Sequence, residues 1–282
     1  MMIGTFIKKT RDTIKHYGMI SSGDRILVAV SGGSDSVALL NVLVMLKDEF
    51  KIFLNVANID HSLRGDESRK DSDFVKNLAE KFLIPFEHKK INLASFKKTK
   101  KSFEEYAREA RYEFFKKAAS KLGCNIIATA HTINDQAETI LMRIIKGTSA
   151  KGITGIPPIR YEDDFKIIRP FIDIEKKEIK EYLARISCPF REDSSNCDTK
   201  YFRNAVRLEI LPFLEKYNPK ITRAISNLSD NLRDDLTFIE SAKKNAIKHF
   251  LLSSGIVKHE GGFGINIKYF ILVLLSFVGR FL

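Results

Sequence analysis

Short apolar runs alternate with longer amphipathic stretches over the first half of the chain. Strands are predicted at residues 26–30, 52–59, 84–91 and 125–128. All of them except 84–91, which contains Pro85 and several charges, are nearly continuous in apolar residues, as strands buried on both faces should be. Helical patterns lie between them, at residues 36–50, 67–82 and 102–122. This alternation predicts an α/β fold with a doubly wound, mainly parallel sheet.

The chain after Lys151 has a different pattern. A loop rich in Gly and Pro precedes a short strand and a helix near 174–186. From Asn218 a polar helical pattern runs to about residue 252, with Pro219 as a helix-start proline. We therefore predict a main domain over residues 1–215 and a smaller, mainly helical region over 216–282. The last segment, from Tyr269 to Leu282, is apolar but shorter than the roughly 20 residues of a membrane-spanning helix. We expect it to be a buried strand or helix.

Composition and charge narrow the class of protein. The chain has 282 residues, of which 44% are hydrophobic and 29% charged, and this matches an ordinary globular protein. The 47 Lys and Arg exceed the 35 Asp and Glu by 12, which favours a polyanionic partner such as nucleic acid over a merely basic proteome. The three cysteines have no C-x-x-C spacing and the N-terminus has no signal-peptide run, so we expect a cytoplasmic protein with no membrane attachment.

The first candidate for chemistry lies between the first strand and the helix after it. It consists of Ser31, Gly32, Gly33, Ser34, Asp35 and Ser36. Paired glycines allow a close backbone approach, and the start of a helix directs N–H groups and a positive dipole at a ligand, so the site suits a phosphate. Asp35 makes sense beside phosphates chiefly if Mg²⁺ lies between them. The structural alternative is a strand-to-helix turn capped by serines.

Two common nucleotide-binding loops do not fit. Residues 147–152 approach a G-x-x-x-x-G-K-[ST] loop, but Ile153 stands where lysine is required, and no G-x-G-x-x-G follows the first strand. The sequence SGGSDS resembles instead the PP-loop of the N-type ATP pyrophosphatases, which cleave ATP to AMP and pyrophosphate to adenylate a carbonyl oxygen.

Further motifs narrow the resemblance. They are NIDHSLR at 58–64, AREARY at 107–112, HTINDQAET at 131–139 with Arg143 and Gly147, and EDSSN at 192–196 with Tyr201, Arg203, Asn204, Arg207 and Pro212. In this order and spacing they are similar to tRNA(Ile)-lysidine synthetase over about residues 20–215.

That resemblance implies a reaction and its partners. ATP, with Mg²⁺, would adenylate the C2 oxygen of the wobble cytidine in an isoleucine tRNA with a CAU anticodon. The ε-amine of free L-lysine would then displace AMP to give lysidine. Residues 1–215 would be the catalytic PP-loop domain. Related enzymes commonly carry further domains that grip tRNA, so 216–282 is a linker helix with either a minimal or a truncated tRNA-binding part.

Asp135 and Glu138 are three residues apart on a predicted helix, so both carboxylates face the same side. By resemblance they are catalytic, with Arg111 and Asp35, and could hold the lysine ammonium or assist its deprotonation. The alternative is an amphipathic helix with two solvated acids.

Other positions are assigned more loosely. His61 and Arg64 follow the second strand, where open α/β sheets place ligands, and we expect them near the nucleotide. The alternative for His61 is a strand-end histidine that caps backbone. Arg203, Asn204 and Arg207 either shape the active-site or tRNA-facing surface or stabilise a loop.

Two rival functions stay open. A tRNA thiolase of the same superfamily would need paired or catalytic cysteines, and Cys188 and Cys197 are nine apart with no C-x-x-C. A non-catalytic tRNA-binding protein would have little reason to retain Asp35, Asp135 and Glu138 together, and ATP turnover distinguishes it from both enzymes.

Overall fold

A single twisted sheet forms the centre of the protein. The computed structural model describes residues 3–60, 66–90, 103–191, 202–253, 258–259 and 262–263. The sheet has six strands in the order β3-β2-β1-β4-β6-β5. They are β1 (Arg25–Ala29), β2 (Phe53–Asp60), β3 (Phe86–Lys90), β4 (Ile126–Ala128), β5 (Ile159–Glu162) and β6 (Phe165–Ile168). All are parallel except β5, which pairs with β6 as an antiparallel hairpin. The predicted doubly wound, mainly parallel sheet is confirmed.

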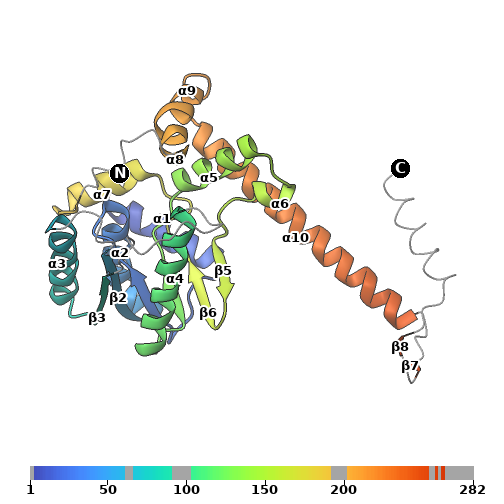
Figure 1. The fold of residues 1–282 in the computed structure, drawn as a ribbon, viewed down its shortest axis with the longest axis horizontal. Helices are drawn as coiled ribbons and strands as arrows, with labels where there is room; N and C mark the ends of the chain where they lie inside the picture. The colour runs from blue at the N-terminus through green and yellow to red at the C-terminus, as the bar shows by residue number, and fades with distance from the viewer. Residues whose placement is uncertain are drawn as a thin grey trace.

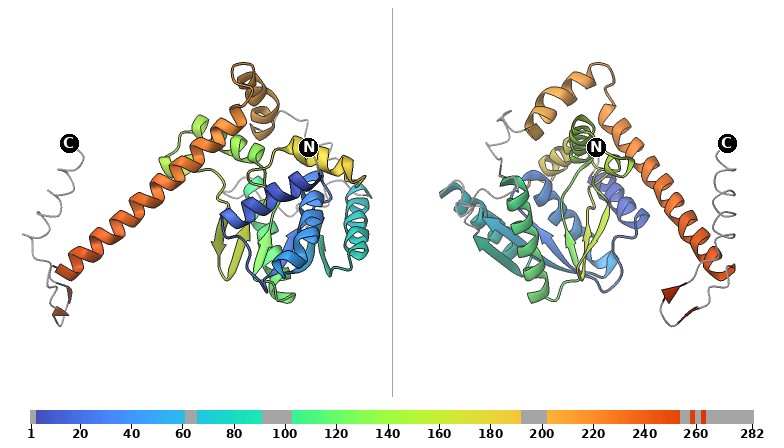
Figure 2. Two further views of the ribbon diagram at one scale, coloured as in Figure 1. Left: turned by 180° about the vertical axis from the view of Figure 1, so that it is seen from behind. Right: turned by 45° about the vertical axis from the view of Figure 1, so that its right-hand side comes forward.

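Helices cover both faces of the sheet (Figure 1). The first seven are α1 (Ile3–His16), α2 (Ser34–Phe50), α3 (Asp66–Lys81), α4 (Phe103–Lys121), α5 (Ile133–Lys146), α6 (Ala150–Ile153) and α7 (Lys176–Arg185). They are followed by α8 (Phe202–Ala205), the π-helical turn η3 (Val206–Ile210), α9 (Leu211–Glu215), α10 (Ile221–Ser253) and a short ribbon of β7 (Lys258–His259) with β8 (Gly262–Phe263). Figures 1 and 2 show α4 on one face of the sheet and α1 and α2 on the other.

Alternation along β1 divides the core between the two faces. Ile26 and Val28 are fully buried with α1, α2 and α7, whereas Leu27 between them is buried against α4. A third cluster joins α5 to the later helices through Ala137, Ile140 and Ile225. Because successive side chains of a strand point to opposite faces, a continuously apolar strand serves two cores, which is the pattern that predicted β1, β2 and β4.

The polar strand 84–91 is also present, as β3, and its place explains its composition. It lies at the edge of the sheet and pairs with β2 alone, so charged side chains remain exposed there. Pro85 stands just before β3, and its carbonyl accepts the Val56 N–H at 2.9 Å. Proline is tolerated at such a position because it lacks only the donor.

Two features near the ends differ from the sequence prediction. The amphipathic helix α1 was not predicted; its residues Phe6 and Ile14 are fully buried. The long helix near the end begins at Ile221 rather than at Pro219, because Asn218 starts a turn in which its carbonyl accepts the Ile221 N–H. The apolar segment 269–282 lies outside the described residues.

The helix α10 leaves the body of the protein. Its first turns pack on α5 and α6, and the remainder projects away from the sheet (Figures 1 and 2). The division between residues 1–215 and 216–282 stays a prediction. In the part of the chain that the structure describes, no helix combines the length and apolar character needed to cross a membrane.

Candidate active site at the switch point of the sheet

The sheet order creates a switch point between β1 and β4. The connections from β1 through β2 to β3 run toward one edge, and the chain then returns to the other side of β1 with β4. Ligands of open α/β sheets bind at such a point, beyond the carboxyl ends of the strands. The helices that follow these two strands, α2 and α5, both begin there. The sequence motifs at their starts are therefore brought side by side.

The motif SGGSDS forms the turn from β1 into α2. Gly32 has a φ of +94°, a backbone conformation that favours glycine, and Gly33 is the N-cap of α2 without a side-chain cap. The hydroxyls of Ser31 and Ser36 lie 3.1 Å apart, and the Ser36 hydroxyl donates to the Gly33 carbonyl at 3.0 Å. These serines hold the turn together. The first amides of α2 are left uncapped by the N-cap, as an anion site requires.

The start of α5 is fixed by a capping box. The Thr132 hydroxyl accepts the Asp135 N–H, and the Asp135 carboxylate accepts the Thr132 N–H at 2.9 Å and its hydroxyl at 2.7 Å. Such a box satisfies two orphan donors of a helix. Both hydrogen bonds from Thr132 go to Oδ2 of Asp135, so Oδ1 is available to other partners. Asp135 is thereby oriented by its own helix.

Two arginines from later in the chain meet the carboxylates of α5. Arg207 donates from Nε to Oε1 of Glu138 at 2.6 Å and from its terminal nitrogen to Oε2 at 2.9 Å. Arg203 donates from Nε to Oε2 of Glu138 at 2.8 Å and from a terminal nitrogen to Oδ1 of Asp135 at 3.0 Å. Glu138 is only 1% exposed and Asp135 only 9%. The alternative of two solvated acids is therefore wrong.

A lysine side chain also reaches both acids. Lys176, the first residue of α7, places its ammonium 3.2 Å from Oδ1 of Asp135 and 3.8 Å from Oε1 of Glu138. Its backbone N–H donates to the Asn134 side chain at 2.9 Å, which ties α7 to α5. The two carboxylates thus accommodate a primary ammonium as well as guanidinium groups.

The electrostatics distinguish the carboxylates. Burial raises the pKa of Asp35, against the opposing effect of Lys176, while the nearby Asp135 raises it further. Burial would also raise the pKa of Asp135, but Lys176 and Arg203 outweigh it and hold that pKa below its usual range. The hydrogen bond to Glu138 raises the pKa of Arg207. Asp135 is therefore firmly ionised, whereas the charge on Asp35 is opposed by the fold.

Other predicted residues are placed differently. Arg111 is exposed on α4, and the ion pairs of Asp135 and Glu138 among the described residues come instead from Lys176, Arg203 and Arg207. His61 and Arg64 lie outside the described residues. Asn204 lies on α8 beside Arg203.

Sequence reasoning overlooked Lys176 and the capping role of Thr132. Nothing in the local pattern of α7 marks Lys176, since a lysine at a helix start is ordinary. The cap was detectable, because Thr132 precedes Asp135 at the capping-box spacing.

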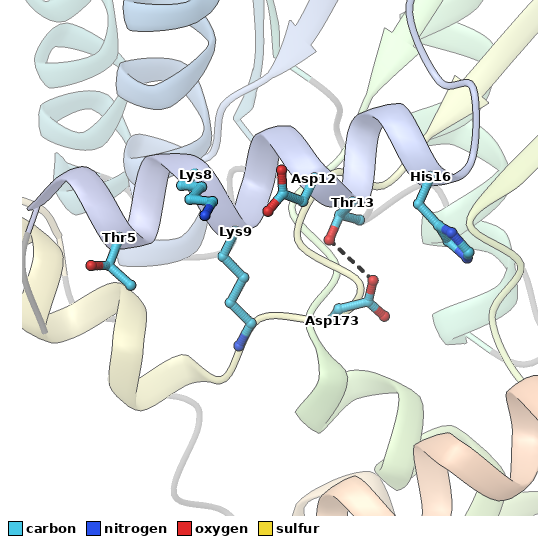
Figure 3. Close-up of a pocket in the computed structure, with 7 residues that line it drawn as sticks. All are labelled: Thr5, Lys8, Lys9, Asp12, Thr13, His16 and Asp173. Carbon is cyan, nitrogen blue, oxygen red and sulfur yellow. Dashed lines mark hydrogen bonds between the residues drawn. The ribbon is translucent and has the colours of Figure 1, made fainter.

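A separate pocket of about 430 Å³ lies along α1 and the loop before α7 (Figure 3). It is lined by Thr5, Lys8, Lys9, Asp12, Thr13, His16 and Asp173. The Thr13 hydroxyl donates to Asp173 at 3.1 Å. None of the residues that the motifs predicted lines this pocket.

Comparison with known proteins decides the family. Residues 4–214 match the model of the PP-loop domain. The chain belongs to the PP-loop domain family. The resemblance inferred from SGGSDS is thus confirmed at the level of the family, and we keep the name PP-loop for the turn from β1 into α2 that carries this motif.

Curated relatives of this PP-loop protein are named tRNA(Ile)-lysidine synthase. That of Clostridium tetani is 40% identical over 245 residues, covering 86% of this chain and 52% of the relative. That of Clostridioides difficile is 40% identical over 265 residues, covering 93% and 56%. That of Geobacter sulfurreducens is 34% identical over 261 residues, covering 92% and 54%. The chain therefore spans about half the length of the curated relatives it matches.

Among solved structures, the PP-loop protein is similar to the U34-tRNA thiolase NcsA from Methanococcus maripaludis with its [4Fe-4S] cluster. The TM-score is 0.64 at 17% identity, and the match covers 80% of this chain and 77% of that one. At this identity the likeness shows a shared fold alone.

Proposed function

We propose that this PP-loop protein uses ATP to join free L-lysine to C2 of the wobble cytidine of an isoleucine tRNA with a CAU anticodon. The relatives of this name support the proposal, and so does the cluster at the switch point. In this proposal residues 1–215 are the catalytic domain and 216–282 supply a linker helix and part of the tRNA contact. The reaction would take place in the cytoplasm.

The observation that carries the proposal is the buried acid pair beside the PP-loop. Asp135 and Glu138 hold the Lys176 ammonium at 3.2 and 3.8 Å, and Asp135 lies within electrostatic reach of Asp35. The ε-ammonium of a substrate lysine has the same chemistry as that of Lys176. An amine delivered here would lie next to the site where the nucleotide phosphates are expected.

The chain would activate the cytidine in a first step. The C2 oxygen attacks the α-phosphorus of ATP and pyrophosphate leaves. The uncapped amides of α2 would receive phosphate oxygens. Arg203 and Arg207 add positive charge at the same edge, where negative charge develops on the leaving group.

In the second step the neutral ε-amine of lysine attacks C2, and AMP leaves with the former C2 oxygen. The ε-ammonium must first lose a proton, which would pass to solvent water. Asp135 and Glu138 would orient the ammonium through the same oxygens that now contact Lys176. Converting the oxygen to a phosphoester splits a difficult displacement into two easier ones.

The residues present fit Mg²⁺ bound through ATP. Within the described ranges, no group of three His, Cys, Asp or Glu side chains could hold a metal ion. Mg²⁺ commonly uses one or two carboxylates together with phosphates and water. Asp35 would supply a carboxylate, and the bound ion would neutralise phosphate charge.

The two rival functions have less support. Cys124 is buried just before β4, at the amino ends of the strands, whereas Asp35 follows the carboxyl end of β1. The Asn55 amide donates to the Cys124 sulfur at 3.2 Å. Cys188 lies 3.6 Å from the Asn41 amide in the middle of α2. Neither thiol is at the switch point where a thiolase would deliver sulfur, and Cys197 lies outside the described residues. A non-catalytic tRNA-binding protein would bind RNA without turning over ATP.

The test is lysine transfer by the full chain. Purified protein is incubated with radiolabelled L-lysine, Mg·ATP and an unmodified CAU-anticodon isoleucine tRNA transcript, with a methionine tRNA transcript as control. Label in the isoleucine tRNA alone, with release of AMP, supports the proposal. Release of pyrophosphate without label in the tRNA would indicate a nucleophile other than lysine. The absence of any ATP turnover would favour the non-catalytic tRNA-binding protein.

A further inference from the structure

Among the residues that the structure describes, the largest fully buried side chain is that of Arg169, which follows β6 directly and is 1% exposed. One terminal nitrogen donates to the Pro157 carbonyl at 2.6 Å, but Nε is buried without a partner. Over the described ranges no carboxylate pairs with this guanidinium. A buried charge of this kind destabilises the fold unless something compensates it.

The neighbours of Arg169 add positive charge. Tyr112 of α4 is 6% exposed, and the guanidinium carbons of Arg108 and Arg160 are each 5.0 Å from its ring centroid. Glu162 pairs with Arg160, but Arg108 has no ion pair in the part of the chain that is described. Of these three guanidinium groups, only that of Arg160 pairs with a carboxylate among the described residues.

The Tyr112 hydroxyl is also unsatisfied. It lies close to the Arg169 guanidinium, yet it is buried and has no partner of good hydrogen-bond geometry among the described residues. A buried hydroxyl without a hydrogen-bond partner is also destabilising. An unpaired donor beside an uncompensated cation is what an oxyanion ligand would satisfy, because each oxygen accepts several hydrogen bonds.

This cluster adjoins the candidate active site. β6 and β4 are parallel neighbours, so Arg169 and His131 both follow carboxyl ends at the same edge of the sheet. The ring of His131 is within electrostatic reach of Asp135 and Arg203 of the candidate active site and also of Arg169 and Arg108. Burial lowers the pKa of His131 to about 3, so this ring stays neutral between the two clusters.

We propose that Arg169, the Tyr112 hydroxyl and Arg108 form a subsite for an oxyanion carried by a substrate. The ligand group is a carboxylate or a phosphate. Its identity rests on the proposed function, which offers three sources: the α-carboxylate of L-lysine, the phosphates of ATP and the phosphates of the tRNA. The two guanidinium groups and the hydroxyl would donate hydrogen bonds to the oxygen atoms of any of these groups.

Variants of the full chain test the subsite by equilibrium binding without turnover. Tyr112→Phe retains the ring that contacts the two arginines and removes only the hydroxyl, and Arg108→Gln removes one exposed cation. The control is Tyr161→Phe on β5, where the side chain is 75% exposed. Arg169→Lys retains the buried charge and changes its donors. Each protein is compared with wild type by thermal unfolding, so that a folding defect is recognised separately.

The readout is a ratio of affinities in three arms. They compare L-lysine with L-lysinamide, ATP with adenosine, and the tRNA transcript at two salt concentrations. A lost hydrogen bond to a charged group predicts that Tyr112→Phe reduces the preference for the oxyanion about tenfold in one arm. Arg108→Gln reduces the same preference, or the salt dependence if the ligand is tRNA, while Tyr161→Phe changes nothing.

Wild-type preferences in all three arms for both Tyr112→Phe and Arg108→Gln would overturn the subsite. A merely structural role would weaken both ligands of a pair equally and leave each ratio unchanged, which also overturns it. Failure of the proposed function can be told apart from failure of the subsite. In that case the wild-type protein would transfer no lysine, while its binding of ATP and of the tRNA transcript could still be measured.

Discussion

The burial of Glu138 gives the sharpest prediction, for Glu138→Gln. The carboxylate is 1% exposed and receives three hydrogen bonds from Arg203 and Arg207, at 2.6 to 2.9 Å. Glutamine retains the shape and one carbonyl oxygen but removes the charge. Its NH₂ group would face guanidinium donors, since one of the two former acceptor oxygens becomes a donor.

The expected loss of stability follows from how exposed the partners Arg203 and Arg207 are. Breaking a fully buried ion pair costs about 3–5 kcal/mol. The side chains of Arg207 and Arg203 are 27% and 36% exposed, so water can rehydrate part of each guanidinium. We therefore expect a loss of about 2–3 kcal/mol, which for a domain of this size corresponds to a fall in Tm of roughly 5–10 °C.

The assay is thermal and denaturant unfolding of the full chain, beside a matched surface variant. Glu49→Gln removes a carboxylate that pairs with Arg11 and Lys15 and is 37% exposed, so its loss should stay below about 1 kcal/mol. An equal fall in Tm for Glu138→Gln and Glu49→Gln would refute the reasoning.

A double-mutant cycle isolates the ion pair itself. Glu138→Gln combined with Arg207→Gln should be less destabilised than the sum of the single variants, with a coupling of about 1–3 kcal/mol. Additive losses would show that the two charges do not interact. In the lysine-transfer assay, Glu138→Gln should also raise the lysine requirement, and unchanged lysine dependence would remove Glu138 from the amine site.

Three further substitutions test the turn and the cap. Asp35→Asn should raise Tm at neutral pH while abolishing pyrophosphate release, because burial raises the pKa of Asp35 and the fold opposes its charge. The gain should shrink as the pH falls through that raised pKa and vanish below the ordinary pKa of an aspartate, where the carboxyl is neutral in the folded and the unfolded chain; an unchanged Tm at neutral pH would contradict it. Thr132→Val should cost about 1–2 kcal/mol in chemical unfolding because it removes the cap of α5, and a loss no larger than that of an exposed substitution would argue against the capping box. Gly155→Ala should lower stability by about 1–3 kcal/mol, because φ is +64° and the new Cβ would collide with the Gln136 side chain, whereas Gly4→Ala, in open space on α1, should be neutral or stabilising; similar Tm values for the two would disprove the strain.

Hydrophobic periodicity and the order of the motifs predicted much of the fold and part of the candidate site. The continuous apolar strands predicted a two-faced parallel sheet because a strand buried on both faces needs apolar residues at every position. The glycines of SGGSDS predicted a phosphate loop because they stand between a strand and a helix, where the backbone can approach a ligand closely and the first amides of the helix point at it. Asp135 and Glu138 were placed on one helix face by the helical repeat alone. These are local properties, and a local stretch of chain specifies them.

Tertiary structure decided what surrounds those groups. Lys176, Arg203 and Arg207 come from elements 38 or more residues along the chain from Glu138, and no local spacing marks them as its partners. The same holds for Arg169, whose burial beside Tyr112 depends on how β6 packs against α4. The sequence by itself thus determined which residues can bind an anion or an ammonium. The packing of distant segments determined which charges are compensated, because Coulomb interactions and desolvation depend on distance in space and on exclusion of water rather than on separation along the chain.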